Sequence, residues 1–233
     1  MEEITSGLSE AVRLLLGGNS EVWEIIRLSL RVSMMATAIA LLVGIPLGAS
    51  LALARFPGRS IAVGVVYAGM GLPPIVAGLV VSVFLWRNGP FGTLGLLYTP
   101  TAMVVAQALI ATPVVAGLSL AAVSALNPRY RLQLLALGAN RWQSIWWLLR
   151  EARLPLIAAV VAGFGAVISE VGAAMMVGGN IKGETRVLTT ATVLEVSRGH
   201  FETAFALSFV LLGLTYLVTM ALALLQQQHS PAR

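Results

Sequence analysis

The chain contains no cysteine and no aspartate, and it has one lysine, Lys182, and two histidines, His200 and His229. Without cysteine it can form no disulfides, thiolate metal sites or cysteine nucleophiles. Without aspartate, intramembrane aspartyl proteolysis and aspartate-rich metal sites for phosphoryl or prenyl transfer are excluded. Lys182 is not part of a G-x-x-x-x-G-K-[ST] motif, so the chain has no P-loop. We therefore expect no catalytic residue, no metal site and no cofactor in this chain, and any ATP it uses to be bound by a partner.

Charge is also scarce, because charged residues make up 11% of the chain and hydrophobic residues 58%, with a mean hydropathy of +0.87. Such a chain has too little polar surface for a soluble domain. A membrane-spanning helix needs about 20 mostly apolar residues. We therefore expect an all-α polytopic membrane protein, a single domain over residues 1–233. Five segments are predicted to span the membrane: 32–54, 61–86, 101–126, 155–179 and 203–225.

Basic residues in short loops indicate the cytoplasmic side. The loop 127–153 holds five arginines and one glutamate, and the loop 55–60 is also basic, so both are expected in the cytoplasm. Residues 1–27 carry five glutamates and two arginines, which places the N-terminus outside. The C-terminal tail QQQHSPAR is then cytoplasmic. Within the N-terminal segment, GLSEAVRLLL predicts either a peripheral helix on the outer surface or a terminal helix that only packs.

Helix-breaking residues lie inside the second predicted span, at Pro73 and Pro74 in GLPPIVAG. Proline removes a backbone donor, and at membrane depth this is tolerated mainly where neighbouring helices or a water-filled cavity satisfy the freed groups. The pair therefore indicates either ordinary helix packing or a transport path.

The basic loop NPRYRLQLLALGANRWQSIWWLLREARLP, residues 127–155, has apolar residues at helix-like spacing, interrupted at Gly138. We expect two short amphipathic helices that meet at Gly138 and Ala139, beside Arg141 and Trp142. A corner of small residues would fit a groove on another protein. Alternatively, the helices lie on the membrane surface, with tryptophans among the headgroups and arginines on anionic lipid.

A lone carboxylate, Glu170, stands in the fourth predicted span. A charge near the bilayer centre costs at least about 2.5 kcal/mol, so such residues usually face a bundle interior or a cavity. Its partner is expected from another helix, another copy or water, and Arg31 is one candidate. A structural hydrogen bond from a protonated Glu170 is the alternative. The glycines, threonines and Arg186 of the following segment, VGGNIKGETRVLTTATVLEVSRG, predict an ordered loop whose donors suit an oxyanion.

Two segments together resemble the permease subunit of type I ABC importers. LQLLALGANRWQSIWWLL resembles the family's E-A-A-x-x-x-G coupling motif at Gly138, although Leu132, Gln133 and Leu134 stand at the E-A-A positions. ISEVGAAMMVGGNIKGETRVLTTATVLEVSRGHFETAFALSFVLL, residues 168–212, is similar to molybdate and tungstate permeases and most similar to the tungstate branch. GIPLG, MGLPPIVAGL and GPFGTLGLLYTP extend the resemblance over nearly the whole chain.

This resemblance implies a type I importer fold and the import of tungstate or molybdate across the cell membrane. It implies a homodimer of permeases in membrane lipid, with two ABC ATPase subunits that bind ATP and Mg²⁺ and an external substrate-binding protein. No nucleic-acid partner is expected.

The resemblance also implies roles for three groups of residues. The residues implied to couple the permease to the ATPase are Gly138, Ala139, Asn140, Arg141 and Trp142. The residues implied to form the gate or translocation path are Glu170, Gly172, Gly178, Gly179, Asn180, Pro73 and Pro74. The residues implied to dock the binding protein are Lys182 and Arg186. Because an anion path is an awkward place for a carboxylate, we expect Glu170 to brace the helices of the gate.

Two alternatives remain. The same fold could serve sulfate or phosphate, because the separate binding protein largely selects the anion. An ion-coupled secondary transporter would use Glu170 as its proton site, although the chain shows no internal repeat between its halves, and the loop 127–153 is structured.

Overall fold

The computed structural model describes residues 2–18 and 20–228, and every regular element within these ranges is helical. The predicted all-α fold is therefore confirmed. In chain order the elements are α1 (Glu2–Leu16), α2 (Ser20–Leu53), α3 (Arg59–Met70), α4 (Pro74–Leu85), the 3₁₀ turn η1 (Gly92–Leu94), α5 (Pro100–Ser124), α6 (Pro128–Ala136), α7 (Arg141–Glu151), α8 (Arg153–Ile168), α9 (Gly172–Gly178), α10 (Leu188–Ser197) and α11 (Phe201–Gln228).

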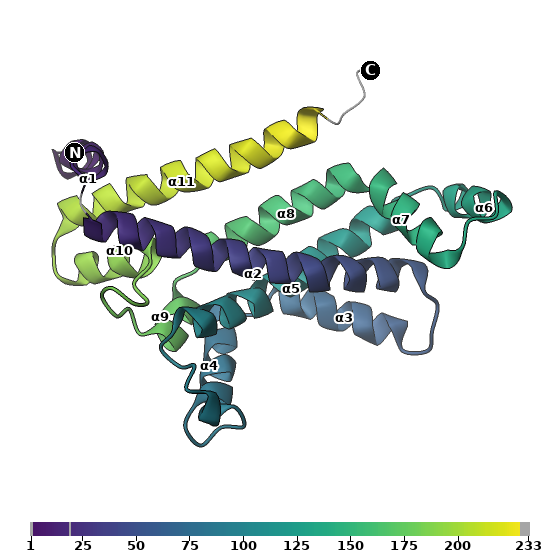
Figure 1. The fold of residues 1–233 in the computed structure, drawn as a ribbon, viewed down its shortest axis with the longest axis horizontal. Coiled ribbons are helices and arrows are strands. Elements are labelled where there is room, and N and C mark those ends of the chain that lie inside the picture. Colours follow the sequence, from purple (N-terminus) through teal and green to yellow (C-terminus); the bar gives the residue numbers. More distant parts are fainter. Residues whose placement is uncertain (1, 19, 229–233) are drawn as a thin grey trace.

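An elongated bundle forms the body of the molecule, with α2, α3, α5, α8 and α11 lying roughly along its long axis (Figure 1). Helices α6 and α7 lie at one end of the bundle, and α1 and α10 at the other. Helix α4 leaves the long axis and points to one side. The molecule thus presents two distant ends, joined by helices of membrane-spanning length.

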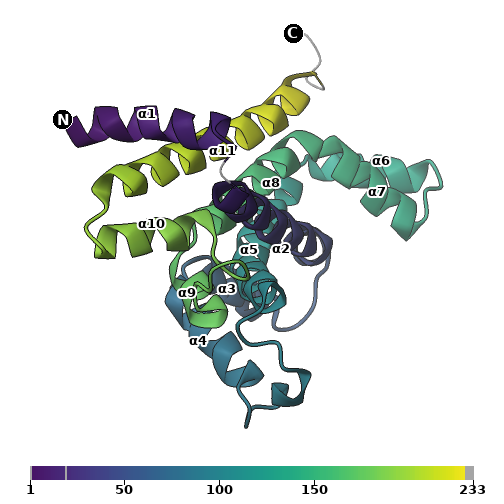
Figure 2. The same cartoon turned by 60° about the vertical axis from the view of Figure 1, so that its left-hand side comes forward.

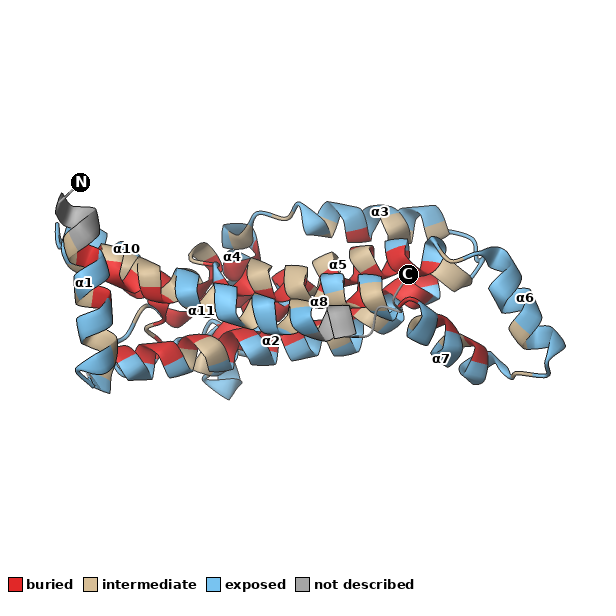
Figure 3. Cartoon of the chain, turned by 90° about the horizontal axis from the view of Figure 1, so that it is seen from above, coloured by how far each residue is buried: buried red, intermediate tan, exposed pale blue. Residues whose placement is uncertain are grey.

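Helix α5 forms the core of the bundle, and it packs against α2, α3 and α8. Glycines allow α2 to approach it closely: a Cβ added at Gly48 would lie only 2.3 Å from the carbonyl oxygen of Ala116. The outer face of α2 is apolar and exposed, as at Leu42, which is 77% exposed. Figure 3 shows the buried residues concentrated along α5 and the exposed residues on α6 and the outer faces. An apolar exterior around a packed core is expected of a protein surrounded by lipid.

Three described helices, α2, α5 and α11, are individually long and apolar enough to cross a membrane, and up to five spans result if two bent helix pairs each count as one. Helices α5 and α11 coincide with the predicted spans 101–126 and 203–225. The helix expected over 32–54 begins earlier, at Ser20, because the amphipathic residues before it continue the helix and pack against α10 and α11.

The predicted span 61–86 consists of two helices, because α3 and α4 meet there at an angle of 102°. Pro73 is the N-cap of α4 and Pro74 its first residue. Neither proline has a backbone N–H to continue the ladder of α3, so the helix ends at Met70 and restarts in a new direction.

The predicted span 155–179 is also divided into two helices. Helix α8 ends at Ile168, and the chain becomes helical again only at Gly172, in the short α9. The apolar sequence runs through this break without a proline, so hydropathy gave no sign of it. At its other end α8 continues from α7 across a bend of 72°.

The predicted N-terminal peripheral helix is α1, which crosses α11 (Figure 2). The crossing is close, because a Cβ added at Gly7 would lie 2.5 Å from the Cβ of Phe205. At the opposite end of α11, residues 229–233 of the predicted cytoplasmic tail lie outside the described residues. Helix α11 ends towards α6 and α7 (Figure 1), so the chain reaches Gln228 on the same side as the loop 127–153.

Candidate translocation gate and coupling corner

The break between α3 and α4 lies directly beside the break between α8 and α9. Gly78 of α4 faces Ala173 of α9 so closely that an added Cβ would lie 2.7 Å from the Ala173 Cα. A Cβ at Gly172 would lie 3.5 Å from the Cβ of Ile75, the second residue of α4. The Ser82 hydroxyl donates to the carbonyl of Met176, at 3.3 Å. The structure therefore places Gly172, at the start of α9, against the first turn of α4, which follows the predicted gate residues Pro73 and Pro74 in the chain.

Glu170 holds the α8–α9 break together through hydrogen bonds to backbone and side chain. Its carboxylate Oε1 accepts the backbone N–H of Ala173, at 3.1 Å, in the first turn of α9. Its own carbonyl accepts the hydroxyl of Thr189 on α10, at 3.0 Å. Glu170 is 9% exposed. A carboxylate at this position satisfies one of the free N–H groups with which every helix begins.

The partner of Glu170 is thus a backbone amide on its own segment. Arg31, the predicted candidate partner of Glu170, is not in contact with it among the described residues. Arg31 instead lines a pocket at the α1–α10 end of α2. The hydrogen bond also explains why a carboxylate occurs in this apolar stretch: the break exposes backbone donors that need an acceptor.

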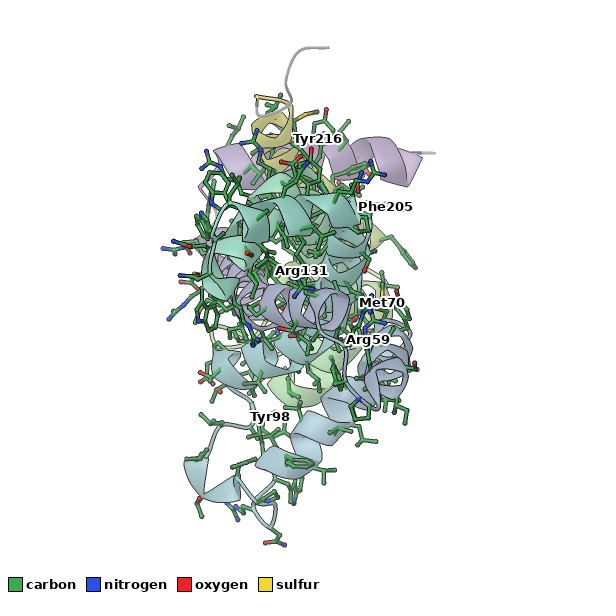
Figure 4. The ribbon with its side chains drawn as sticks, turned by 90° about the vertical axis from the view of Figure 1, so that its right-hand side faces the viewer. Arg59, Met70, Tyr98, Arg131, Phe205 and Tyr216 are labelled. Atoms are coloured by element: carbon green, nitrogen blue, oxygen red, sulfur yellow. The ribbon has the colours of Figure 1, made fainter. Side chains whose placement is uncertain are left out.

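A tight turn follows α9 and is packed against Tyr98. Gly179 and Asn180 both have positive φ, 70° and 53°. A Cβ at Gly179 would lie 2.9 Å from Cδ1 of Tyr98, and the Tyr98 N–H donates to the carbonyl of Val177, at 2.8 Å. Tyr98 (labelled in Figure 4) has a φ of 64°, which is strained for an aromatic residue. Strain of this kind persists only where the surrounding contacts hold it.

The loop after this turn is ordered by Thr185, whose side chain is fully buried. Its hydroxyl donates to the carbonyl of Gly178, at 2.6 Å, and accepts the N–H of Ile181, at 2.9 Å. Asn180 donates from its amide to the carbonyl of Thr190, at 3.3 Å. The loop is therefore a folded unit anchored to both α9 and α10.

The two predicted docking cations, Lys182 and Arg186, both meet Glu21 on α2. The Lys182 Nζ lies 2.6 Å and an Arg186 guanidinium nitrogen 3.5 Å from its carboxylate oxygens. The Lys182 side chain is 65% exposed, whereas that of Arg186 is only 14% exposed. Arg186 is thus mainly part of the structure that ties the loop to α2, and Lys182 remains accessible at the rim of a pocket of about 470 Å³.

The predicted corner at Gly138 and Ala139 lies at the other end of the molecule, between α6 and α7 (Figure 1). Gly138 has a φ of 82°, and its N–H donates to Leu135 while that of Ala139 donates to Leu134, both at 3.0 Å. This pair of bonds is the Schellman ending of a helix, for which glycine is favoured.

Asn140 then begins α7 with a capping box. Its side chain accepts the N–H of Gln143, and the Gln143 side chain accepts the N–H of Asn140, both at 2.9 Å. The corner therefore has a defined conformation and leaves apolar side chains outside: Leu137 is 84% exposed and Trp142 81%. Exposed apolar groups on a rigid turn are typical of a docking surface.

Three residues that the sequence analysis did not single out complete these sites: Glu21, Tyr98 and Thr185. Tyr98 precedes Thr99 and Pro100, and such a Thr-Pro helix start predicts a turn, so a local signal existed. No local signal existed for Glu21, because its partner lies 161 residues away.

Comparison with known proteins agrees with this architecture. Residues 44–233 match the family model "Binding-protein-dependent transport system inner membrane component". The chain is 41% identical to the tungstate uptake system permease protein TupB of Peptoclostridium acidaminophilum, over 98% of this chain and 100% of that protein. It is 39% identical to a probable anion ABC transporter permease protein of Haloferax volcanii, over 82% and 84% of the two chains.

Among solved structures, a chain of the MetNI methionine ABC transporter in inward-facing conformations superposes with a TM-score of 0.74. The superposition covers 91% of this chain and 95% of that one at 20% identity, so the likeness is one of fold. The polytopic helical architecture, the family match over most of the length and the full-length relative lead to one conclusion. The chain belongs to the family of binding-protein-dependent transport system inner membrane components and has the fold of type I ABC importer permeases.

Proposed function

We propose that this chain is the permease subunit of an ATP-driven importer that moves tungstate or molybdate across the cell membrane. The observation that carries the proposal is the 41% identity to a tungstate uptake permease, which extends over the whole length of both proteins. The loop after α9, whose donors are predicted to suit an oxyanion, is part of that shared length.

The α4–α9 contact is the proposed gate. Helix α9 is a seven-residue segment between two chain breaks, and its ends are tied to the rest of the chain by hydrogen bonds with Glu170, Tyr98 and Thr185. Conformational change in proteins is absorbed at loops and at the ends of elements, so a short helix bounded by two breaks suits a moving gate. In a homodimer two copies of this segment would face each other, and backbone N–H groups of the loop after α9 would meet the anion.

The proposed orientation places α6 and α7 in the cytoplasm and the N-terminus outside. The corner of Gly138, Ala139, Asn140, Arg141 and Trp142 then docks on an ATPase subunit, which supplies the site for ATP and Mg²⁺. The loop with Lys182 faces an external binding protein. The basic character of 127–153 supports this orientation.

Elemental analysis of cells tests the substrate. The gene is deleted, cells are grown in trace tungstate and molybdate, and cellular tungsten and molybdenum are compared with the parent and a complemented strain. We expect tungsten to fall in the deletion strain and to return on complementation. A fall in both elements would broaden the substrate to both oxyanions. Unchanged tungsten and molybdenum, with redundant systems removed, would contradict the proposal and direct the test to sulfate and phosphate.

Docking of the binding protein is tested at Lys182. We expect Lys182→Glu to lower the affinity of the assembled transporter for its binding protein, because the exposed charge is reversed at the rim of the loop. Stability should change little, since an exposed ion pair contributes only about 0–1 kcal/mol. The control is Arg87→Glu, outside this loop, which should leave the affinity unchanged. Equal binding of Lys182→Glu and the parent protein would remove Lys182 from the docking surface.

A further inference from the structure

A groove of about 860 Å³ lies where the end of α2 meets α6 and α7. Three arginines line it, Arg55, Arg131 and Arg141, and none of the described residues that line it is acidic. Apolar side chains make up the rest of its wall, with Pro46 on α2 and Trp146 on α7 among them. The groove therefore combines uncompensated positive charge with an apolar floor.

The three arginines differ in what they already bind. Arg131 (labelled in Figure 4) donates to the carbonyl of Leu53, at 3.0 Å, and so caps the last turn of α2. Within the described part of the chain, the side chains of Arg55 and Arg141 make no hydrogen bond or ion pair. Ser144 also lines the groove, and its buried hydroxyl has no hydrogen-bond partner among the described residues. Donors thus remain in the groove for a further acceptor.

The apolar part of the groove continues the lipid-facing surface of α2. Leu42, Val43 and Leu47 are exposed on that helix, about two to three turns before its end. On the other side of the groove Trp146 is 65% exposed. Tryptophan is enriched at the headgroup level of membranes, and basic pockets between helices there bind anionic headgroups.

We propose that this groove binds an anionic phospholipid, with the phosphate at Arg55 and Arg141 and the acyl chains along the exposed face of α2. A free inorganic anion would use the arginines but leave the apolar floor uncovered. A lipid matches both parts, since its headgroup and chains meet at the membrane interface. The inference goes beyond the proposed transport function, because it does not depend on which anion is carried.

The bound lipid would connect α2 to the corner that is proposed to dock the ATPase. Arg141 belongs to that corner, and Arg55 follows the end of α2. A phosphate held by both arginines would therefore join the membrane bundle to the coupling elements and favour one position of α6 and α7 relative to the bundle.

Native mass spectrometry of the assembled transporter tests the proposal. The permease with its ATPase subunits is purified in detergent and incubated with equimolar phosphatidylglycerol and phosphatidylcholine of the same chain length. We expect preferential retention of phosphatidylglycerol. Arg55→Gln should reduce the retention about fivefold, the effect expected for one basic residue at an anionic headgroup. Arg129→Gln is the matched control, because Arg129 is an exposed arginine on α6 that does not line the groove.

Four results would overturn the proposal. Equal retention of both lipids would show that the groove has no anion preference. An equal effect of Arg129→Gln would show diffuse attraction by the basic end of the molecule. Loss of the lipid on addition of millimolar inorganic phosphate would identify a free-anion site. Retention by the isolated permease but not by the assembled transporter would show that the ATPase occupies the groove.

Discussion

Glu170 satisfies the backbone N–H of Ala173, which is fully buried. Replacing Glu170 by alanine would leave this donor without an acceptor, at a cost of about 1–3 kcal/mol. Glutamine keeps an oxygen at the same place and can still accept the bond. We therefore expect Glu170→Ala to lower the thermal unfolding midpoint and abolish most uptake, and Glu170→Gln to retain most of both. Thermal unfolding and tungstate uptake of the two variants provide the check.

The same pair of variants separates bracing from proton transfer. In an ion-coupled transporter with Glu170 as the proton site, glutamine would abolish uptake as completely as alanine, because an amide cannot carry the proton. Loss of uptake in Glu170→Gln with an unchanged unfolding midpoint would contradict the bracing role.

Two glycines near the proposed gate, Gly78 and Gly178, differ in what surrounds them. A Cβ at Gly78 would lie 2.7 Å from the Ala173 backbone, whereas one at Gly178 would meet the flexible side chain of Met103, with 2.9 Å to its Sδ. We expect Gly78→Ala to destabilise the protein by about 1–3 kcal/mol, the usual cost of overpacking, and Gly178→Ala by less. Gly165→Ala is the control, since nothing lies within 4 Å of its added Cβ.

Thermal unfolding of the purified variants gives the ranking. The expected order of unfolding midpoints is Gly165→Ala highest, Gly178→Ala next and Gly78→Ala lowest. A midpoint of Gly78→Ala equal to that of Gly165→Ala would mean that α4 and α9 are not in close contact.

Among the elements, the corner between α6 and α7 is the proposed docking surface for the ATPase. A charge introduced there should selectively weaken ATPase binding. Leu137→Glu places a charge on an 84% exposed side chain beside Gly138, without disturbing the glycine's positive φ. We expect the variant to fold but to copurify with much less ATPase, because a charge would be buried at the interface. Leu16→Glu, on an 83% exposed leucine of α1, is the control at the opposite end of the molecule.

Copurification is measured by pull-down of tagged permease with the ATPase at several salt concentrations. Equal amounts of ATPase with Leu137→Glu and Leu16→Glu would place the docking surface elsewhere. Substituting Gly138 itself is less informative, because any side chain there strains the turn whether or not a partner binds.

The elements themselves were partly predictable from sequence. Hydropathy identified α5 and α11, since both are continuous apolar helices, and the periodicity interrupted at Gly138 predicted α6 and α7. Pro73 and Pro74 were recognised as helix-breaking residues. Because the residues on both sides of them are apolar, the sequence predicted one span where the structure has the two helices α3 and α4. The break after Ile168 could not be predicted, because it is stabilised by hydrogen bonds that Glu170 accepts from Ala173 and Thr189, and only the folded chain brings Thr189 to this place.

In the molecule as a whole, contacts between residues far apart in the chain could not be predicted from the sequence. Composition predicted a polytopic helical membrane protein, which is confirmed. The pairing of Glu21 with Lys182 and Arg186 depends on the arrangement of α2 beside the loop after α9, and no local pattern encodes it. For Tyr98 the local sequence predicted a turn, but its contact with Gly179 arises only because α5 begins beside α9.

The central claim is that this permease imports tungstate at the expense of ATP. The most direct test is tungstate accumulation in proteoliposomes that contain the permease with its ATPase, with ATP enclosed and the binding protein outside. We predict accumulation that requires ATP and the binding protein and is lost with Leu137→Glu. Accumulation driven by an ion gradient without ATP, or no accumulation when all components are present, would contradict the account.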